Sequence, residues 1–182
     1  MSIITIKEVP YNKGKYRITS SKLFNDFLDF PFKLFKNDKM FVPSLYMDER
    51  NTFNKKINPA LAWCEYKIFL AYKDDELCGR IVGIINNKAN EIWKRKYIRF
   101  GWFDTIDDAD VAQALFNAVI NWGKSRGLDK IVGPMGFTDM DKEGMIVWAE
   151  IPYISEHLPN GRENTFSQMK ELIVQNFNHP CI

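Results

Sequence analysis

The feature that most constrains this chain is the stretch 97–135, which reads in turn as strand, helix and strand. Residues 98–106 mix aromatic and β-branched side chains, which suit a pleated and half-buried strand. Asp107 and Asp108 follow, and a carboxylate there can accept N–H bonds from the first turn of a helix. The short apolar run 129–135 predicts a second strand. The stretch therefore predicts a parallel strand–helix–strand unit, with the right-handed connection that such units adopt.

The helix between these two strands has one apolar face and polar ends. Asp110 adds negative charge near the positive end of the helix dipole, and Gly127 provides a left-handed stop after Lys124 and Arg126. Such a unit directs the N-terminus of the helix toward the carboxyl edge of the sheet, where anions bind in many folds. The residues at helical spacing that form the apolar face are Val111, Leu115, Ala118, Val119 and Trp122.

A second strong signal lies earlier in the chain. Two β-rich runs, 63–72 and 77–86, flank the polar residues 73–76 and predict an antiparallel hairpin. Gly79 and Gly83 fall inside the second run, where glycine indicates either a bulge or the close approach of another backbone.

The ends of the chain carry weaker patterns. Residues 2–9 alternate and predict an edge strand, while the serine pair at 20–21 can cap a helix rich in Leu and Phe. Pro31 interrupts that helical pattern, so the helix either starts again there or kinks. Residues 41–50 predict a turn that leads into a short helix, and residues 165–177 predict a final helix.

Composition limits the class of protein. The 182 residues are 46% hydrophobic, which is enough for one substantial core, and we expect a single domain over 1–182. A net charge of +2 gives no reason to expect nucleic acid or an anionic membrane as a partner. The cysteines, which lack a C-x-x-C pair, favour a reduced compartment. There is no signal-peptide pattern and no apolar run near the ~20 residues of a membrane span, so we expect a soluble cytoplasmic protein.

Residues 88–99 are locally basic, with Trp93 and Tyr97 among the positive charges. Basic residues interleaved with aromatic ones can form a nucleic-acid surface. The alternative is a solvated excursion between strands. The near-neutral charge of the whole chain favours the excursion, because nucleic-acid binding needs a stronger positive footprint.

Taken together, the order of these elements resembles the GNAT-type acyl-CoA N-acyltransferase fold, and more closely an uncharacterised bacterial group of GNAT-like proteins. The resemblance covers about residues 22–147 and rests on the segments FVPSLYMDER, FLAYKDDELCGRIVGIINNKANEIW, RFGWFDTIDD and GPMGFTDMDKEGM. It implies an α/β (α+β) class with a GNAT-like mixed sheet. The order would be an N-terminal strand, a helical region, an antiparallel hairpin and then a strand–helix–strand crossover.

The resemblance also implies acetyl-CoA or another acyl-CoA as cofactor. Its pantetheine arm would lie along the backbone of 103–106, and its pyrophosphate near 108–112. GNAT enzymes usually carry an Arg/Gln-x-x-Gly-x-Gly/Ala loop there, whereas this chain has DTIDDADVA, with four aspartates and no glycine. Acidic side chains repel a pyrophosphate unless they turn away. The cofactor-binding residues that the resemblance implies are Phe103, Thr105, Ile106, Asp108, Asp110, Val111 and Ala112.

For catalysis the resemblance implies transfer of an acyl group to a small-molecule amine that the sequence does not identify. The amine is held near the acyl carbonyl, backbone donors stabilise the oxyanion, and a carboxylate or a water chain accepts the proton. Asp104, Asp139 and Glu143 are the candidates for that carboxylate, because they would lie at strand ends facing a cleft. The alternative is a non-catalytic GNAT-like scaffold that dimerises or docks a partner.

The chain departs from the group again after Val147, where further strands and helices would normally follow. Strands that complete the sheet are then missing or rebuilt. An incomplete sheet leaves an unpaired edge, and such edges invite pairing with another chain. We therefore expect a homodimer.

Other candidate chemistry has simpler explanations. Residues 139–150 nearly spell a calcium-binding EF-hand loop, but no helix precedes them, so we expect no metal site. The only histidines, His157 and His179, lack metal-ligand spacing. Cysteines within the hairpin are expected to be small core residues. The strand arginines, Arg80 and Arg99, would need a charged partner if buried, such as Asp74 or Asp107.

Overall fold

The computed structural model of the protein describes residues 3–10, 21–39, 41–138 and 140–141. Five strands form one mixed sheet in the order β1-β2-β3-β4-β5. The first four are antiparallel to their neighbours, while β4 and β5 are parallel. The predicted α/β (α+β) class with a mixed sheet is therefore confirmed. The strands are β1 (Ile4–Glu8), β2 (Cys64–Lys73), β3 (Glu76–Asn86), β4 (Tyr97–Thr105) and β5 (Lys130–Val132).

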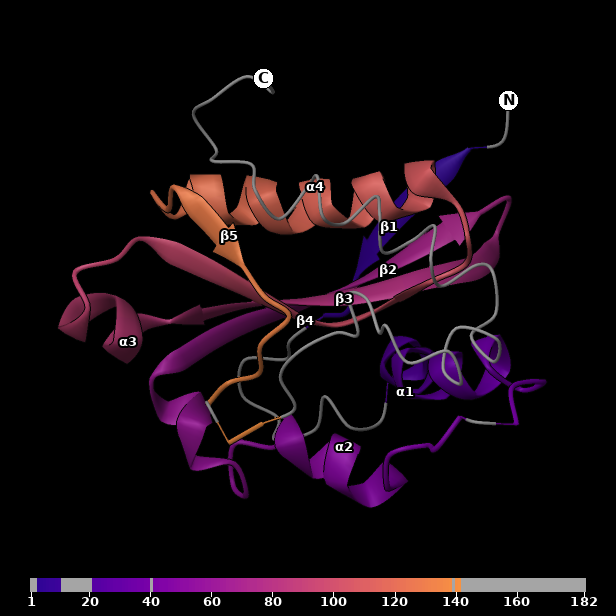
Figure 1. The fold of residues 1–182 in the computed structure, drawn as a ribbon, viewed down its shortest axis with the longest axis horizontal. Coiled ribbons are helices and arrows are strands. Elements are labelled where there is room, and N and C mark those ends of the chain that lie inside the picture. Colours follow the sequence, from indigo (N-terminus) through magenta and orange to yellow (C-terminus); the bar gives the residue numbers. More distant parts are fainter. Residues whose placement is uncertain (1–2, 11–20, 40, 139, 142–182) are drawn as a thin grey trace, which may run out of the picture.

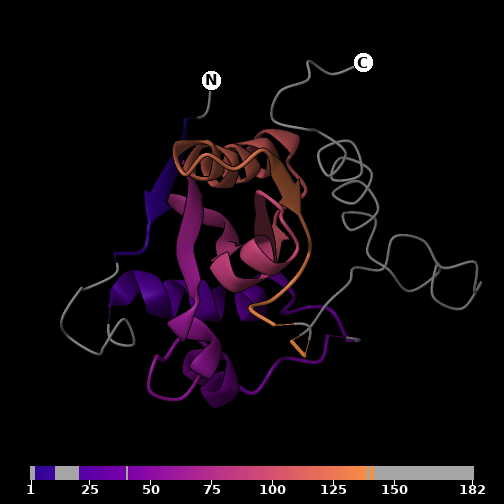
Figure 2. The same ribbon diagram turned by 90° about the vertical axis from the view of Figure 1, so that its left-hand side faces the viewer.

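Helices cover both faces of this sheet. Helix α4 (Ala109–Ser125) lies along one face, and α1 (Lys22–Leu34) and α2 (Tyr46–Thr52) lie on the other side (Figures 1 and 2). The 3₁₀ turn η2 (Pro59–Ala62) precedes β2. Within the part of the chain that the structure describes, none of the helices combines the length and the apolar character that crossing a bilayer requires.

The central strand β3 contributes side chains to the hydrophobic cores on both faces of the sheet, because alternate residues of a strand point to opposite faces. Val82 and Ile84 join the aromatic core under α1, while Ile81 and Ile85 join the core under α4. The β2–β3 register shifts between Ala71, opposite Gly79, and Tyr72, opposite Leu77, so of the two predicted alternatives Gly79 borders a bulge. A side chain at Gly79 would meet the Leu115 side chain at 2.8 Å, and no backbone atom is among its three nearest neighbours.

The predicted turns and caps are also present. Strands β2 and β3 meet at Asp74 and Asp75, whose φ angles of 50° and 66° fit the two-residue hairpin turns that match strand twist. Ser21 caps α1, Asp108 caps α4, and Gly127 adopts the left-handed conformation with φ of 70°. The short helix expected after the turn in 41–50 is α2.

Three expectations need correction or completion. The strand expected over 129–135 is only Lys130–Val132, because Pro134 has no N–H to continue a ladder. The excursion at 88–99 contains a short helix, α3 (Asn87–Ile92), whose N-terminus is capped by Asn86. Helix α1 continues through Pro31 instead of restarting there. The helix expected over 165–177 lies outside the described residues.

Strand β4 contains a bulge that decides which face its later residues occupy. Arg80 and Val82 of β3 oppose Asp104 and Gly101 of β4, so the one residue between them on β3 faces two residues, 102 and 103, on β4. The extra residue is accommodated at Trp102, whose φ is 48°. Before the bulge, Phe100 points into the α4 core, whereas Trp102 packs against the α1 core. The shift places Asp104 on the α1 side of the sheet, because a one-residue slip exchanges the two faces.

The close contact between β4 and the segment after β5 predicts that Gly101→Ala destabilises the fold. An added methyl would lie 2.8 Å from the Met135 carbonyl oxygen, and Met135 N–H already donates to Phe100 O at 2.8 Å. We expect a loss of about 1–3 kcal/mol in the free energy of unfolding, measured with urea.

The matched control is Gly83→Ala in the neighbouring strand. Its nearest neighbour would be the Trp122 ring at 3.1 Å, and this half-buried side chain can shift. A loss at Gly83 as large as the loss at Gly101 would contradict the assigned role of the backbone contact.

Candidate functional site

A buried arginine organises the α1 side of the sheet. Arg80 is only 7% exposed, and its guanidinium carbon lies 4.8 Å from the centre of the Phe27 ring. Pro31 lacks the N–H that would bond the Phe27 carbonyl four residues earlier in α1. That carbonyl instead accepts a hydrogen bond of 2.8 Å from Arg80 Nη1. The proline therefore creates an acceptor inside the helix, and the strand arginine satisfies it.

The charge partner of Arg80 is Asp104 of β4. Arg80 Nε donates to Asp104 Oδ2 at 2.8 Å, and Nη2 forms an ion pair with the same oxygen at 2.7 Å. The expected pairing of a strand arginine is confirmed, but the suggested partners Asp74 and Asp107 are wrong. The register explains the difference, because Arg80 and Asp104 are directly opposed across the two strands.

Arg80 and Asp104 are polar lining residues of a cavity of about 190 Å³. Tyr46 and Glu49 of α2 and the neighbouring Ser44 add polar groups. The rest of the wall is apolar, which is the usual composition of a small-molecule site with a few convergent polar groups. The apolar lining residues are Leu28, Pro31, Phe32, Phe35, Phe41 and Val42.

Glu49 is held in this cavity by the bulge. Trp102 Nε1 donates to Glu49 Oε2 at 2.6 Å, which ties α2 to β4. The cavity is thus lined by two carboxylates, those of Asp104 and Glu49, and by one guanidinium. Carboxylates beside an apolar wall can hold a small cation through charge-assisted hydrogen bonds.

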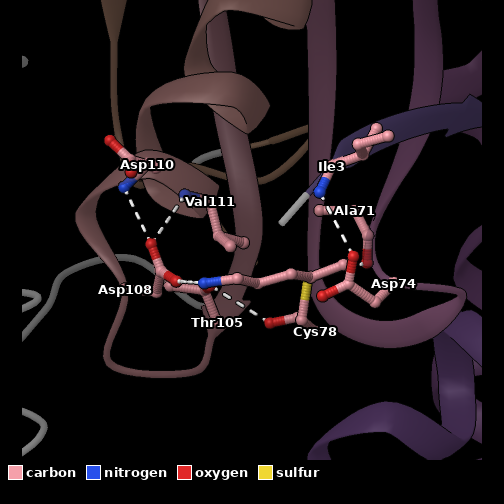
Figure 3. A network of polar contacts seen from close by, with 9 residues as sticks. Ile3, Ala71, Asp74, Cys78, Thr105, Asp108, Asp110 and Val111 are labelled. Atoms are coloured by element: carbon pink, nitrogen blue, oxygen red, sulfur yellow. Dashed lines mark hydrogen bonds and ion pairs between the residues drawn. The ribbon is translucent and has the colours of Figure 1, made fainter. Parts of the chain in front are cut away.

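The opposite face of the sheet presents the N-terminus of α4, where the resemblance implies a pyrophosphate. Asp108 Oδ1 accepts N–H bonds from Asp110 at 3.0 Å and from Val111 at 3.3 Å (Figure 3). Asp108 Oδ2 accepts a hydrogen bond from Lys73 Nζ. The Lys73 hydrogen bond, supported by the cap N–H groups, holds the pKa of Asp108 below its usual value, and the same bond raises the pKa of Lys73.

With Asp108 in place, residues 108–112 do not fit a pyrophosphate. The Ala112 N–H donates to the Asp108 carbonyl, so the donors that an anion would use already have acceptors. A pyrophosphate would have to displace one carboxylate and lie near another, that of Asp110. The first turn of α4 is an anion site that the chain fills with its own side chain.

The other cofactor residues that the resemblance implies are parts of the sheet and its core. Phe103 stacks near Phe116 on the α4 side, with ring centres 4.9 Å apart. Thr105 Oγ1 donates to Cys78 O at 3.2 Å, and Ile106 N–H donates to the same carbonyl at 2.9 Å. These residues do not line the cavity that contains Asp104. Of the three catalytic candidates Asp104 lines a cavity, whereas Asp139 and Glu143 lie outside the described residues.

The hairpin cysteines are core residues, as expected. Burial raises the pKa of the Cys64 and Cys78 thiols to about 11, so neither is a thiolate nucleophile at neutral pH. His157 and His179 lie outside the described residues, as does most of the EF-hand-like run 139–150.

Sequence reasoning missed Glu49, Tyr46 and the aromatic wall. The usable signal was the segment 41–50, where Tyr46 and Glu49 are three residues apart and so share one helical face. No local pattern showed that this face lies opposite the end of β4.

Comparison with known proteins found two curated relatives. Protein YghO of Escherichia coli (strain K12) is 32% identical over 121 residues, which are 66% of this chain and 31% of YghO. Bacterial ceramide synthase of Caulobacter vibrioides (strain NA1000 / CB15N) is 28% identical over 123 residues, 67% of this chain and 32% of that protein. The chain thus spans about a third of the length of these relatives. No protein-family model and no solved structure matches it.

The capped α4 terminus predicts a pH-dependent effect of Asp108→Asn. Asparagine still caps the helix, but it carries no charge for Lys73. Because the folded pKa of Asp108 is lowered, its charge stabilises the fold above the usual carboxyl value of 3.8, and this stabilisation is lost as the pH falls through the folded pKa. The variant should be less stable than the wild type at neutral pH, and the difference should disappear as the pH falls through the lowered pKa of Asp108.

Urea denaturation across this pH range measures the difference. Asp108→Ala serves as the control, because it removes the cap as well and should cost about 1 kcal/mol more than the asparagine variant at neutral pH. A stability gap between Asp108→Asn and the wild type that persists in acid would contradict the ion pair.

The buried ion pair predicts a large effect of Arg80→Met. The change leaves Asp104 and the Phe27 carbonyl without their donor, so we expect a loss of about 3 kcal/mol in the free energy of unfolding. Adding Asp104→Leu should recover part of this loss, because no unpaired carboxylate remains.

Lys67→Met provides the matched control for chemical denaturation. It removes a sheet lysine whose ion pair with Glu8 is exposed, and it should change stability by less than about 1 kcal/mol. If the double variant Arg80→Met, Asp104→Leu is no more stable than Arg80→Met alone, the unpaired Asp104 carboxylate is not the source of the lost stability.

Proposed function

We propose that this chain binds the amine acceptor of an N-acyl transfer reaction in the cavity between α1, α2 and β4. The observation that carries the proposal is the cavity itself, which combines an apolar aromatic wall with the carboxylates of Asp104 and Glu49. The relative named bacterial ceramide synthase supports the same class of reaction, since a ceramide is an amide of a long-chain amino alcohol.

The charges in the cavity suit an amine that arrives as ammonium. Both contacts from Arg80 end on Asp104 Oδ2, and no donor among the described residues bonds Oδ1. Asp104 Oδ1 therefore offers an acceptor to the ammonium group. Glu49, held by Trp102, is a second carboxylate that lines the same cavity. Charge-assisted hydrogen bonds of this kind are among the stronger ones that a protein makes.

The chemical step requires that the bound ammonium first loses a proton to a cavity carboxylate. The nitrogen lone pair then attacks the carbonyl carbon of an activated acyl donor. The new C–N bond forms, the bond from that carbon to the leaving group breaks, and the nitrogen releases a second proton, which balances the proton that the leaving group takes up. Arg80 and Trp102 position Asp104 and Glu49, respectively, for the proton transfer.

We retain an acyl-CoA as a candidate acyl donor, with one restriction on how it is recognised. Because Asp108 fills the N-terminus of α4, we propose that the donor is recognised without a pyrophosphate site there. A long-chain acyl-CoA and the matching acyl N-acetylcysteamine thioester, which lacks the pyrophosphate, should then differ by less than about tenfold in kcat/KM.

The test is an N-acylation assay of the 182-residue chain with a long-chain amino alcohol, following the amide product by mass spectrometry. Glu49→Gln keeps an acceptor for Trp102 and removes the negative charge. We expect kcat/KM for the amine to fall about 10- to 100-fold, the usual value of a hydrogen bond to a charged group.

Asp48→Asn is the control, because it removes an exposed carboxylate from the adjacent position of the same helix. It should leave the rate unchanged. Equal loss in both variants would contradict the assigned role of Glu49. Absence of amide product and of any binding of the amine would instead support the non-catalytic scaffold.

A further inference from the structure

Exposed apolar side chains lie on the segment that lines the cavity and next to its lining residues in the chain. Phe32 and Val42 line the cavity and are 40% and 87% exposed, while Leu45 and Met47, on either side of Tyr46, are 73% and 63% exposed. We call these four residues the apolar rim. Large apolar side chains gathered in one short region of a surface mark a contact with a partner or a lipid.

Basic residues accompany the apolar rim. Lys33, Lys36 and Lys39 are exposed in the same segment, 31–47, and Asp38 is the acid among its described residues. Three positive charges against one negative charge give a local excess of two. Apolar side chains flanked by lysines are the composition that binds the interface of an anionic bilayer.

The cavity size points to the same partner. About 190 Å³ is less than the roughly 300 Å³ at the lower end of pockets for drug-sized ligands, so the cavity holds a headgroup and not a long alkyl chain. The tail of a long-chain amine would have to remain outside, against Phe32 and Val42 at the mouth. A tail in that position would be shielded from water if the mouth faced the hydrocarbon of a bilayer.

We propose that the apolar rim docks onto the surface of an anionic lipid bilayer, with the cavity mouth facing the lipid. The observations that choose this occupant are the lysines beside the rim and the small size of the cavity behind it. The inference goes beyond the proposed function, because binding to lipid requires neither an acyl donor nor catalysis.

The experiment measures sedimentation of the 182-residue chain with vesicles that are rich in phosphatidylglycerol or composed of phosphatidylcholine alone. The combined change Val42→Ser, Leu45→Ser and Met47→Ser should weaken binding to the anionic vesicles about tenfold or more. Changing Lys36 and Lys39 to Gln should weaken it about fivefold per lysine, with little effect on neutral vesicles.

The matched control changes Ile92 and Trp93 to Ser. These residues are 60% and 65% exposed and lie at and after the end of α3, away from α1 and α2 (Figure 1). This variant should bind vesicles as the wild type does. Because all the changed side chains are exposed, circular dichroism should show intact folding in every variant.

Two results would overturn the proposal while leaving the proposed function intact. One is wild-type protein that stays in solution with anionic vesicles at low salt. The other is a rim variant that binds vesicles like the wild type but turns a dimer into a monomer in sedimentation velocity, which would assign the apolar rim to a second copy of the chain. Conversely, vesicle binding without amide formation would sustain the inference and count against the transfer reaction.

Discussion

One buried guanidinium links helix α1 to two strands of the sheet. Arg80 projects from β3 and is almost fully buried, so its positive charge must be compensated within the protein. The acceptors of its hydrogen bonds lie on two other elements. The Phe27 carbonyl of α1 is available only because Pro31 removes the helical donor, and Asp104 of β4 supplies the counter-charge. A buried charge costs several kcal/mol unless its hydrogen bonds are complete. The position of α1 and the face on which Asp104 lies are therefore coupled.

The bulge in β4 provides the second half of this coupling. Without an extra residue at Trp102, strict alternation would place position 104 on the α4 face with Phe100. The bulge moves Asp104 to the side of Arg80, and it also places the Trp102 indole where its N–H reaches Glu49. One irregularity in a strand thus brings residues from α2, β3 and β4 to one cavity. Bulges near functional sites commonly redirect side chains in this way.

The regular elements were predictable from sequence because their signals are local. The hairpin followed from two β-rich runs, and the capping of α4 from an aspartate before an apolar stripe. The bulge was not predictable, since Trp102 looks like an ordinary strand residue, and its partners in the fold, Glu49, Phe53 and Phe137, are far away in the sequence. For the same reason Arg80 was correctly expected to be paired but was assigned the wrong aspartate. Contacts across strands depend on register, and one extra residue changes register without changing composition.

The two faces of the sheet differ in how completely their carboxylates are hydrogen-bonded by the protein. On the α4 side, the helix N-terminus attracts negative charge, and Asp108 supplies it from within the chain, with Lys73 balancing that carboxylate. On the α1 side, Arg80 contacts only Oδ2 of Asp104, so Oδ1 has no donor among the described residues and the carboxylate lines a largely apolar cavity. A cationic ligand gains a charge-assisted hydrogen bond where a carboxylate oxygen has no donor from the protein. This asymmetry is why we place recognition of a small cation on the α1 side, although the sequence directed attention to the N-terminus of α4.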